Sequence, residues 1–182
     1  MTMTQAELNE ILEKHKKWLN NEPGGERADL SHSDLSCSNL SRCNLSHCNL
    51  SRCDLSFSNL SACDLRGSNL SYSDLSACDL RGSNLSYSDL SYSDLRYSNL
   101  SACDLRGSNL SGCNLDYSCL PLWCGSLSAH FDDRHIVQII YHAVKAGLAS
   151  PNVSDEVKAE LRKMAPLANR FHRAEKCGVI EE

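Results

Sequence analysis

Residues 61–90 read SACDLRGSNLSYSDLSACDLRGSNLSYSDL, so that one stretch of fifteen residues occurs twice in succession. Outward from this stretch in both directions, leucine occupies every fifth position from Leu30 to Leu120, nineteen times without a gap. Asp or Asn precedes each of these leucines except Leu120, and the residue before that is Ser, Cys or, once, Ala28. Self-similarity at a fixed period indicates a repeat architecture, in which each unit buries its apolar residues by stacking on its neighbours.

A period of five fits neither regular element. On an α-helix, successive leucines would be rotated by about 140° and would cover every side. In a flat strand, side chains alternate between two faces, so an odd spacing would send neighbouring leucines to opposite faces. All the leucines face a common interior only if the chain turns a corner after every unit. Four units then close a square coil, and residues twenty apart stack in columns, with coils about 4.8 Å apart.

Written as S/C-D/N-L-S/R-x, the unit resembles the A(D/N)LXX motif of the pentapeptide-repeat family over about half of the chain. The resemblance implies an all-β solenoid, the right-handed quadrilateral β-helix, in which the leucine and the small residue point inward. We assign residues 26–120 to this solenoid, residues 1–25 to an N-terminal helical cap with its linker, and residues 121–182 to a C-terminal helical segment. A buried Ser at the small position needs a hydrogen-bond partner, because its burial without one costs about 1–3 kcal/mol.

The composition excludes several classes of protein. The chain has 182 residues, a formal net charge of −5 and only 6% aromatic residues, so leucine must supply most of the burial. No stretch of about 18 apolar residues is present to form a transmembrane helix. The N-terminus lacks the basic and apolar regions of a signal peptide, and we therefore expect a cytoplasmic protein.

Cysteine is abundant, with eleven residues. Seven of them share the small position of the repeat, where Ser or Ala stands in the other units: Cys43, Cys48, Cys53, Cys63, Cys78, Cys103 and Cys113. Exchange with Ser and Ala indicates a small buried side chain. Because disulfides are uncommon in the cytoplasm, we expect reduced structural thiols rather than a disulfide framework.

An amphipathic helix is predicted at residues 4–20. Thr4 and Glu7 form a capping box at its start. Its apolar positions are Leu8, Ile11, Leu12, Trp18 and Leu19. The helix could plug the first coil and shield unpaired backbone edges, or it could dock a partner; we favour the plug.

Two further helices are predicted after a linker at residues 121–127, in which Leu122 and Trp123 should cover the last coil. The first helix spans about residues 132–146 and ends at Gly147. Its apolar face consists of Ile136, Ile139, Ile140, Ala143 and Val144. The second begins after the N-cap candidate Ser154 and kinks at Pro166. Its apolar stripe consists of Val157, Leu161, Met164 and Leu167.

This apolar helix pair must pack somewhere, either on the end of the solenoid or against a second copy of the chain. Relatives in the family pair through their C-terminal ends. We favour a homodimer, with Ile136, Ile139, Ile140 and Val144 as the candidate contact residues.

No motif for catalysis is present. The chain has no nucleotide-binding loop, zinc-protease motif or serine-hydrolase motif, and we expect no enzymatic activity, cofactor or metal. His135 and His142 could share a helix face, but no carboxylate or thiol stands at a matching offset. This favours two histidines that are hydrogen-bonded or solvated over a metal site. His32 and His47 occupy outward positions of the repeat and are expected on the surface.

Two sets of outward residues are candidate interaction surfaces. Stacking places Asp34, Asp54, Asp74 and Asp94 in one column, where the repelling charges could attract a cation. Asp and Asn at this position also suit local turn bonding, and we favour that explanation. The other set is two stacks, Tyr72 over Tyr92 and Tyr97 over Tyr117. Exposed tyrosine is favoured at interfaces, although it also shields coil edges.

Two functions remain. The first is a scaffold or interaction module with an unknown protein partner. The second, implied by the family, is a DNA mimic that occupies the DNA-binding surface of a type II topoisomerase (gyrase). Residues 26–120 carry eleven acidic and seven basic residues, a net charge of −4, whereas DNA carries about one charge per 1.7 Å. The repeats also lack the loops found in gyrase-protecting members. We favour the scaffold, and without a basic patch we do not expect direct binding to nucleic acid.

Overall fold

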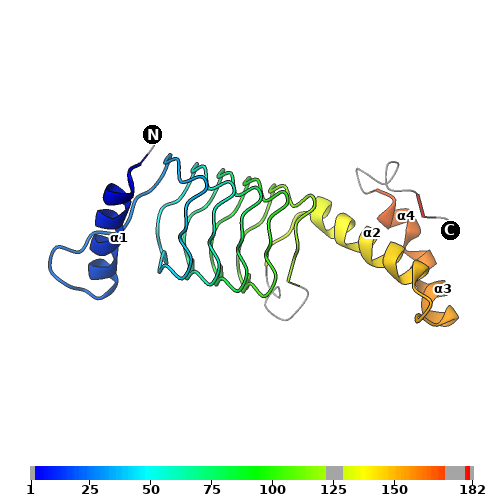
Figure 1. Ribbon diagram of the computed structural model, residues 1–182. Helices are drawn as coiled ribbons and strands as arrows, with labels where there is room; N and C mark the ends of the chain where they lie inside the picture. The colour runs from blue at the N-terminus through cyan, green and yellow to red at the C-terminus, as the bar shows by residue number, and fades with distance from the viewer. Residues whose placement is uncertain (1–2, 122–128, 171–178, 181–182) are drawn as a thin grey trace. The chain divides into compact units, whose positions relative to one another are not determined.

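The computed structural model describes residues 3–121, 129–170 and 179–180. Two compact units follow one another along the chain, Met1–His130 and Phe131–Glu182. The first contains helix α1 (Gln5–Leu19) and the repeat region, and the second contains helices α2, α3 and α4 (Figure 1). Within the described residues, no helix is long and apolar enough to cross a membrane. Leu122 and Trp123, which were expected to cover the last coil, lie outside the described residues.

The repeat region is a stack of coils with a turn in every five-residue unit. Parallel β-bridges join residues twenty apart, such as Asn49 with Asn69 and Asn69 with Asp89. The backbone N–H of each leucine from Leu30 to Leu100 donates to the next coil, as in the 2.7 Å bond from the Leu50 N–H to the Asn69 carbonyl. The predicted stacking by twenty residues is therefore confirmed, and Figure 1 shows the coils lying side by side.

The interior of the stack is a column of leucines. From Leu30 to Leu115, every leucine of the repeat is at most 4% exposed. The last one, Leu120, is half-buried. Full burial stabilises each leucine by about 1.5–3 kcal/mol relative to an exposed side chain. This repeated contribution is the main favourable term of the fold.

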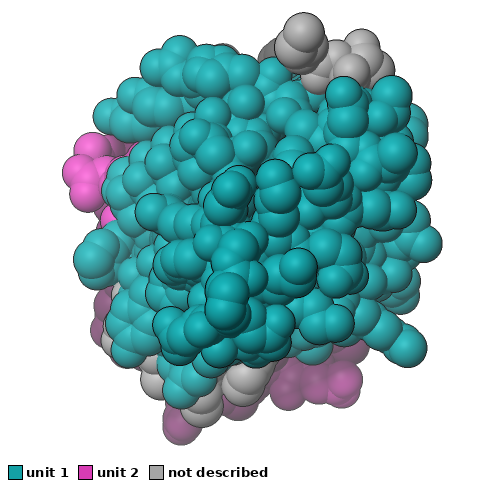
Figure 2. All heavy atoms as spheres, turned by 90° about the vertical axis from the view of Figure 1, so that its left-hand side faces the viewer, with its two compact units in different colours: residues 1–130 teal, residues 131–182 magenta. Residues whose placement is uncertain are grey.

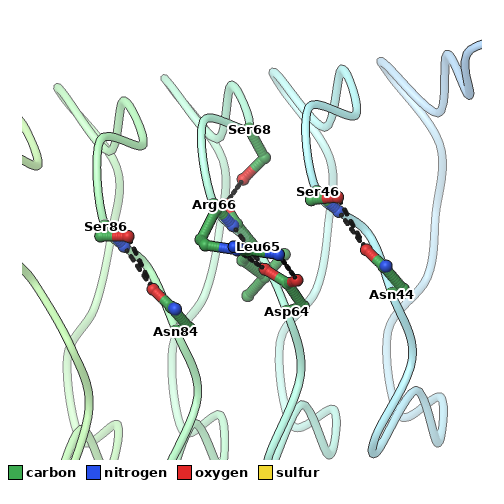
Figure 3. Close-up of polar contacts among 8 residues, drawn as sticks. All are labelled: Asn44, Ser46, Asp64, Leu65, Arg66, Ser68, Asn84 and Ser86. Carbon is green, nitrogen blue, oxygen red and sulfur yellow. Dashed lines mark hydrogen bonds and ion pairs between the residues drawn. The ribbon is translucent and has the colours of Figure 1, made fainter. Parts of the chain in front are cut away.

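The small position of the repeat satisfies its polar atom in one of two ways. The Ser68 hydroxyl donates to the carbonyl of Leu65 in its own turn, at 2.6 Å (Figure 3). The Ser73 hydroxyl donates to the Leu50 carbonyl of the preceding coil, at 2.6 Å, and the Cys53 thiol reaches Leu30 in the same way at 2.8 Å. The expected hydrogen bond to turn backbone is therefore confirmed.

Of the seven cysteines at the small position, six are buried thiols, as the exchange with Ser and Ala predicted, and Cys43 is half-buried. Burial raises the pKa of Cys63 and of Cys103 to about 12. A thiol with so high a pKa is almost entirely protonated at neutral pH and is a poor nucleophile. These residues fill space and donate a weak hydrogen bond, and they have no reactive character.

Every corner needs one residue in the left-handed conformation. The Ser33 N–H donates to the Leu30 carbonyl at 3.2 Å, which closes a β-turn, and the intervening His32 has a φ of 60°. The same position in other units is occupied by Arg, Phe, Tyr, Ala or Gly, all with positive φ. For an L-residue this conformation costs about 1–2 kcal/mol.

Helix α1 begins as predicted. Thr4 is its N-cap, and Thr4 and Glu7 form the reciprocal capping box. The chain then turns back so closely that a Cβ at Gly25 would lie 2.3 Å from the Trp18 backbone nitrogen. The Glu26 N–H donates to the Lys14 carbonyl at 3.1 Å, which ties the linker to the helix. Figure 2 looks onto this end of the first unit, and the described surface in view has no deep hollow.

In the second unit the helix boundaries differ from expectation at one point. Helix α2 (Asp133–Ala149) runs past Gly147 and ends at the C-cap Ser150. Gly147 is therefore not a stop signal. A Cβ at this position would lie 2.5 Å from Leu161 Cδ1, so the glycine instead allows α2 and α3 (Asp155–Lys163) to approach closely.

Helix α3 begins as predicted, whereas a separate helix α4 was not predicted. Ser154 caps α3, and its side chain accepts from the Val157 N–H. Helix α4 (Ala165–Ala168) follows after a break at Met164, with Pro166 in its first turn, which confirms the predicted kink.

The core of this unit coincides only in part with the predicted stripes, since Val144 is buried in it and Ile140 packs against it, while Ile136 is exposed. Val137, Tyr141 and Val144 of α2 are buried together with two small residues of α4, Ala165 and Ala168. Of the stripe predicted for the second helix, only Leu161 packs against this core, and the other three members are exposed: Val157, Met164 and Leu167. The alanines determine the contact because their small side chains let α4 lie close to Tyr141.

Replacement of Ala77 by Gly tests the strain at the corners. Ala77 has a φ of 55°, and glycine occupies the same position natively at Gly67 and Gly82. Relief of the left-handed strain, less the entropy of glycine in the unfolded chain, should raise the free energy of unfolding by about 0.5–1 kcal/mol. Guanidinium denaturation followed by circular dichroism measures the change.

The matched control is Ala28→Gly, which replaces a buried alanine at the small position, where φ is not positive. This change should lower the free energy of unfolding by about 0.5–1 kcal/mol. Equal destabilisation by the two substitutions would contradict the assigned strain.

Candidate interaction surface

The outer surface of the solenoid is organised in columns of residues that stack twenty apart. The positions just before the leucines form four such columns, one on each side of the coil. One of them consists of Asp34, Asp54, Asp74 and Asp94, and ends at Asn114; we call it the Asp column. In each of the other three columns Asn alternates or mixes with Asp. The Asp column is thus the place where like charges follow one another without interruption.

Each side chain of these columns bonds to its own corner. The Asp34 carboxylate accepts from the Ser36 N–H at 3.1 Å and from the Ser36 hydroxyl at 2.7 Å. Asn44 makes the same two contacts with Ser46, and Asn84 makes them with Ser86 (Figure 3). The explanation from local turn bonding is therefore confirmed, and it accounts for the exchange of Asp and Asn.

The negative charges of the aspartates in these columns are offset by different neighbouring side chains. Asp64, Asp79, Asp94 and Asp104 are each followed two residues later by an arginine, whose guanidinium lies 2.5 Å from the carboxylate. Figure 3 shows this pair for Asp64 and Arg66. Asp29 and Asp89 instead accept from the side-chain amides of Asn49 and Asn109 on the next coil. Most of the acidic residues of the repeats therefore have a cationic or amide neighbour.

Asp34, Asp54 and Asp74 are the exception. Serine follows each of them at the position that arginine occupies elsewhere. None of them takes part in an ion pair with another residue that the structure describes. Hydrogen bonds from the side chain and backbone of Ser36 lower the pKa of Asp34, which keeps this carboxylate ionised at neutral pH. The column therefore presents a line of carboxylates to solvent.

A metal is not an obvious occupant of the Asp column. Over residues 3–121, 129–170 and 179–180, no group of three or more potential metal ligands gathers closely enough to hold an ion. Carboxylates on successive coils lie side by side, each turned toward its own corner serine. The surface is suited to contact several separate cationic groups.

Both predicted tyrosine stacks form. The rings of Tyr72 and Tyr92 lie 5.0 Å apart with an interplanar angle of 13°, and those of Tyr97 and Tyr117 lie 4.9 Å apart at 6°. All four side chains are more than half exposed. Along the chain Asp94 lies between Tyr92 and Tyr97, so the two stacks occupy the corners on either side of the Asp column. The predicted carboxylates and tyrosines therefore share one face.

Two residues that sequence analysis did not single out extend the first stack. The Arg52 guanidinium lies over the Tyr72 ring, 5.2 Å from its centroid. At the other end, a Cβ at Gly112 would lie 2.7 Å from Tyr92 Cδ1, so the ring lies against glycine backbone. Both residues stand twenty positions from a tyrosine, and the column rule applied to arginine and glycine would have found them.

The remaining sequence candidates do not form a further site. His32 and His47 are exposed, as predicted. His135 is buried beside Asp132, with 2.8 Å between Nδ1 and Oδ1, while His142 is exposed, so the two do not act as a pair. Of the candidate dimer residues, Ile136 is 44% exposed, Ile139 and Ile140 are half-buried, and Val144 lies in the core of its own unit.

Comparison with known proteins supports the repeat. The family described as pentapeptide repeats matches in eight copies, over residues 26–56, 48–86, 58–96 and 88–121. No curated protein matches the chain. A pentapeptide repeat protein of known structure from Nostoc Pcc 7120 is 26% identical, with a TM-score of 0.55; the match covers 72% of this chain and 98% of that one.

Two other solved structures are less similar in shape. A pentapeptide repeat protein of the Arabidopsis thaliana thylakoid lumen is 22% identical, with a TM-score of 0.47, and the match covers 71% of this chain and 78% of that one. HetL, a pentapeptide repeat protein involved in heterocyst differentiation regulation in Nostoc sp. strain PCC 7120, is 28% identical with a TM-score of 0.38. That match covers 58% of this chain and 52% of that one.

The repulsion within the Asp column can be measured as stability. Asp54→Asn with Asp74→Asn keeps the acceptor for the corner and removes two of the stacked charges. The free energy of unfolding should rise by about 0.5–1 kcal/mol at low salt, because carboxylates about 5 Å apart repel even in a medium as polar as water. Chemical denaturation at low and high salt measures the gain, which should shrink as salt screens the charges.

The matched control is Asp64→Asn with Asp104→Asn, which also removes two charges but breaks the ion pairs with Arg66 and Arg106. No gain is expected there. A similar gain in both double variants would show that the effect comes from net charge and not from the column.

Proposed function

Because this chain belongs to the pentapeptide-repeat family, we propose that it is a non-enzymatic scaffold that binds a partner protein on the outside of a right-handed quadrilateral β-helix. The leucines of the repeat fill the interior, so function must reside on the outer columns and at the ends of the coils. We also place the protein in the cytoplasm, where thiols such as those of Cys53 and Cys63 stay reduced.

The observation that carries this proposal is the Asp column between the two tyrosine stacks. Among the described residues, one of its four carboxylates is ion-paired, Asp94 with Arg96, and Arg52 stands on the same face over Tyr72. On the two columns that contain Asp64, Asp79 and Asp104, each carboxylate has its own arginine. Negative charge is therefore concentrated on the face that also carries the exposed rings, and charge complementarity favours a partner with a basic contact segment.

The tyrosines fit the same kind of partner. Tyrosine is enriched in the cores of protein interfaces, because its ring is large and amphipathic. Arg52 lies over Tyr72 within the chain, which is the geometry in which an aromatic ring attracts a guanidinium. Arginine side chains of a partner would contact the exposed ring edges and the carboxylates in turn along this face.

The scaffold is also suited to binding because its surface is already ordered. Backbone hydrogen bonds join each coil to the next, as between Leu55 and Asp74 at 2.7 Å. The stacking of Tyr72 on Tyr92 further limits the motion of the two rings. A partner therefore loses little affinity to the ordering of this face, which is a general advantage of preorganised surfaces.

The geometry gives less support to a DNA mimic than to a protein-binding scaffold. In the Asp column one carboxylate follows another about every 4.8 Å, whereas the DNA duplex carries a charge about every 1.7 Å. Arginine pairs neutralise Asp64, Asp79 and Asp104 on other sides of the coil. A partner that has evolved to hold DNA would meet a surface with roughly a third of the expected charge density.

We propose in addition that the second unit pairs with a second copy of the chain. Ile136 lies near the start of α2 and is 44% exposed, and Ile139 beside it is half-buried. We propose that Ile136 contacts the second copy on the side of α2 that the core of its own unit leaves exposed.

Partner binding is tested with paired variants of the scaffold. Proteins that bind the wild-type chain are captured with it and chemically crosslinked. We expect these proteins to be missing when the double variants Asp54→Asn/Asp74→Asn and Tyr72→Ala/Tyr92→Ala are used instead. Both changes introduce residues that the same repeat positions use natively, so the coils should fold. Quantitative mass spectrometry of the captured proteins measures the loss.

Two control variants match these changes on other sides of the coil. Asp64→Asn/Asp104→Asn removes the same number of charges, and Tyr87→Ala removes a tyrosine that is 77% exposed on a different corner. Capture should survive in both. Partners that persist in all variants would show that this face is not used, and specific recovery of a type II topoisomerase would instead favour the DNA mimic.

The homodimer is tested by light scattering. Wild-type protein should show twice the mass of one chain, and Ile136→Glu should show the mass of one chain. A glutamate there lies in the early part of α2, where the helix dipole stabilises negative charge, so the helix itself should be retained. Wild-type protein with the mass of a single chain would contradict the proposal.

A further inference from the structure

Helix α1 is held on the first coil by a buried histidine. His15 is 0% exposed, and its Nδ1 accepts a hydrogen bond from the Ala28 N–H at 3.2 Å. Ala28 stands at the small position of the first repeat unit, so this contact joins the helix directly to the start of the solenoid. In Figure 1 α1 lies beside the N-terminal end of the coils.

These contacts fix the protonation state of the ring. Because Nδ1 accepts from a backbone N–H, it cannot carry a proton of its own. The single proton of neutral imidazole must therefore sit on Nε2, which lies 3.3 Å from the Cys48 sulfur. Only the neutral form with the proton on Nε2 satisfies both partners.

The charged and titratable groups around His15 oppose a positive charge on the ring. Burial is the largest influence that lowers its pKa, and Arg27 and His47 add to it, while the backbone at Ser46 acts in the opposite direction. Cys48 is the remaining titratable group in contact, and burial raises its pKa to about 12, so it supplies no thiolate to stabilise imidazolium. The ion pair of Lys14 with Glu26 spans the same junction from outside, at 3.6 Å.

We propose that protonation of His15 releases α1 from the first coil, which makes the N-terminal cap a pH-sensitive latch. A second proton on the ring would have to sit on Nδ1, where it would face the Ala28 N–H. The docked state therefore excludes the charged ring, whereas a released helix exposes His15 to water and lets it titrate normally. Release would uncover backbone edges of the first coil that the cap covers.

The direction of the pH dependence follows from the lowered pKa. When α1 is undocked, His15 titrates at about pH 6.5, and when α1 is docked it titrates at a lower pH. Docking is thus at full strength above the undocked pKa. As the pH falls from there toward the docked pKa, the docking equilibrium constant should fall by about tenfold per pH unit. The repeats themselves have no buried histidine after this junction among the residues described up to 121.

Hydrogen exchange with mass spectrometry tests the latch in the full chain. Between pH 7.5 and 5.0, after correction for intrinsic exchange rates, peptides from α1 should lose protection while peptides from residues 50–110 keep it. Fluorescence of Trp18, which stacks on His15 at 5.5 Å, gives a second signal in a Trp123→Phe background. Protection of α1 that is unchanged down to pH 5.0 would overturn the proposal.

Two variants assign the effect to one histidine. His15→Asn can place an acceptor near the Nδ1 position and cannot titrate, so the response over this range should disappear. His47→Asn changes the exposed histidine that also contacts Trp18, at a φ of 61° that Asn tolerates, and the response should persist. A response that follows His47, or survives in His15→Asn, contradicts the latch.

A direct titration covers the case in which His15→Asn does not dock at any pH. The chemical shift of the His15 ring, followed by NMR in the wild-type protein, should give an apparent pKa below the ordinary histidine value of about 6.5. An apparent pKa at or above that ordinary value would overturn the proposal.

Discussion

The structure depends on a corner after every five residues that turns each leucine toward one interior. Most corners place an L-residue at positive φ, as at His32 and Tyr72, and this costs about 1–2 kcal/mol. Burial of the leucine contributes about 1.5–3 kcal/mol. Each backbone hydrogen bond to the next coil adds about 0.5–1.5 kcal/mol. The favourable terms exceed the strain only when neighbouring coils are present, because an isolated coil has neither the inter-coil bonds nor the covered leucines. The repeat therefore requires its own continuation, which explains why the leucine pattern has no gap from Leu30 to Leu120.

The same constraint determines where the chain can vary. The leucine and the small residue are committed to the interior, and the residue before the leucine must accept a hydrogen bond from its corner. What remains is the choice of Asp or Asn, of Ser or Arg, and of the residue at positive φ. These choices decide whether a column is neutral, as with Asp64 and Arg66, or charged, as with Asp34 and Asp54. The corner does not distinguish Asn from Asp, because both accept the same hydrogen bonds from it. An uninterrupted column of Asp is therefore a feature that the fold itself does not require.

The periodic part of the structure could be predicted from the sequence because its geometry is local and repeated. Once residues twenty apart stack, the Asp column and the partners of Tyr72 and Tyr97 follow from counting. The capping box at Thr4 and the break at Pro166 also follow from short-range chemistry. The non-repeating contacts could not be predicted in this way. Gly147 read as a helix stop because glycine commonly ends helices, and only the position of Leu161 in three dimensions shows that it is a packing site. His15 carries no sequence signal that separates it from an exposed histidine, since its burial depends on how the linker folds back at Gly25.

The repeats and the cap respond to different physical variables, and this follows from where their ionisable groups lie. Inside the coils the titratable groups are thiols such as those of Cys63 and Cys103, with pKa values of about 12, which stay neutral at physiological pH. On the outside, the pKa of Asp104 is held low by the hydrogen bond from Arg106, so that pair stays charged over the same range. The charges of these thiols and of the Asp–Arg pairs are consequently almost constant from mildly acidic to mildly basic pH. His15 differs because it is buried while its ordinary pKa lies close to physiological pH. In a scaffold with this arrangement the thiols and the Asp–Arg pairs keep their charge state, while the junction of α1 with the first coil can change with pH.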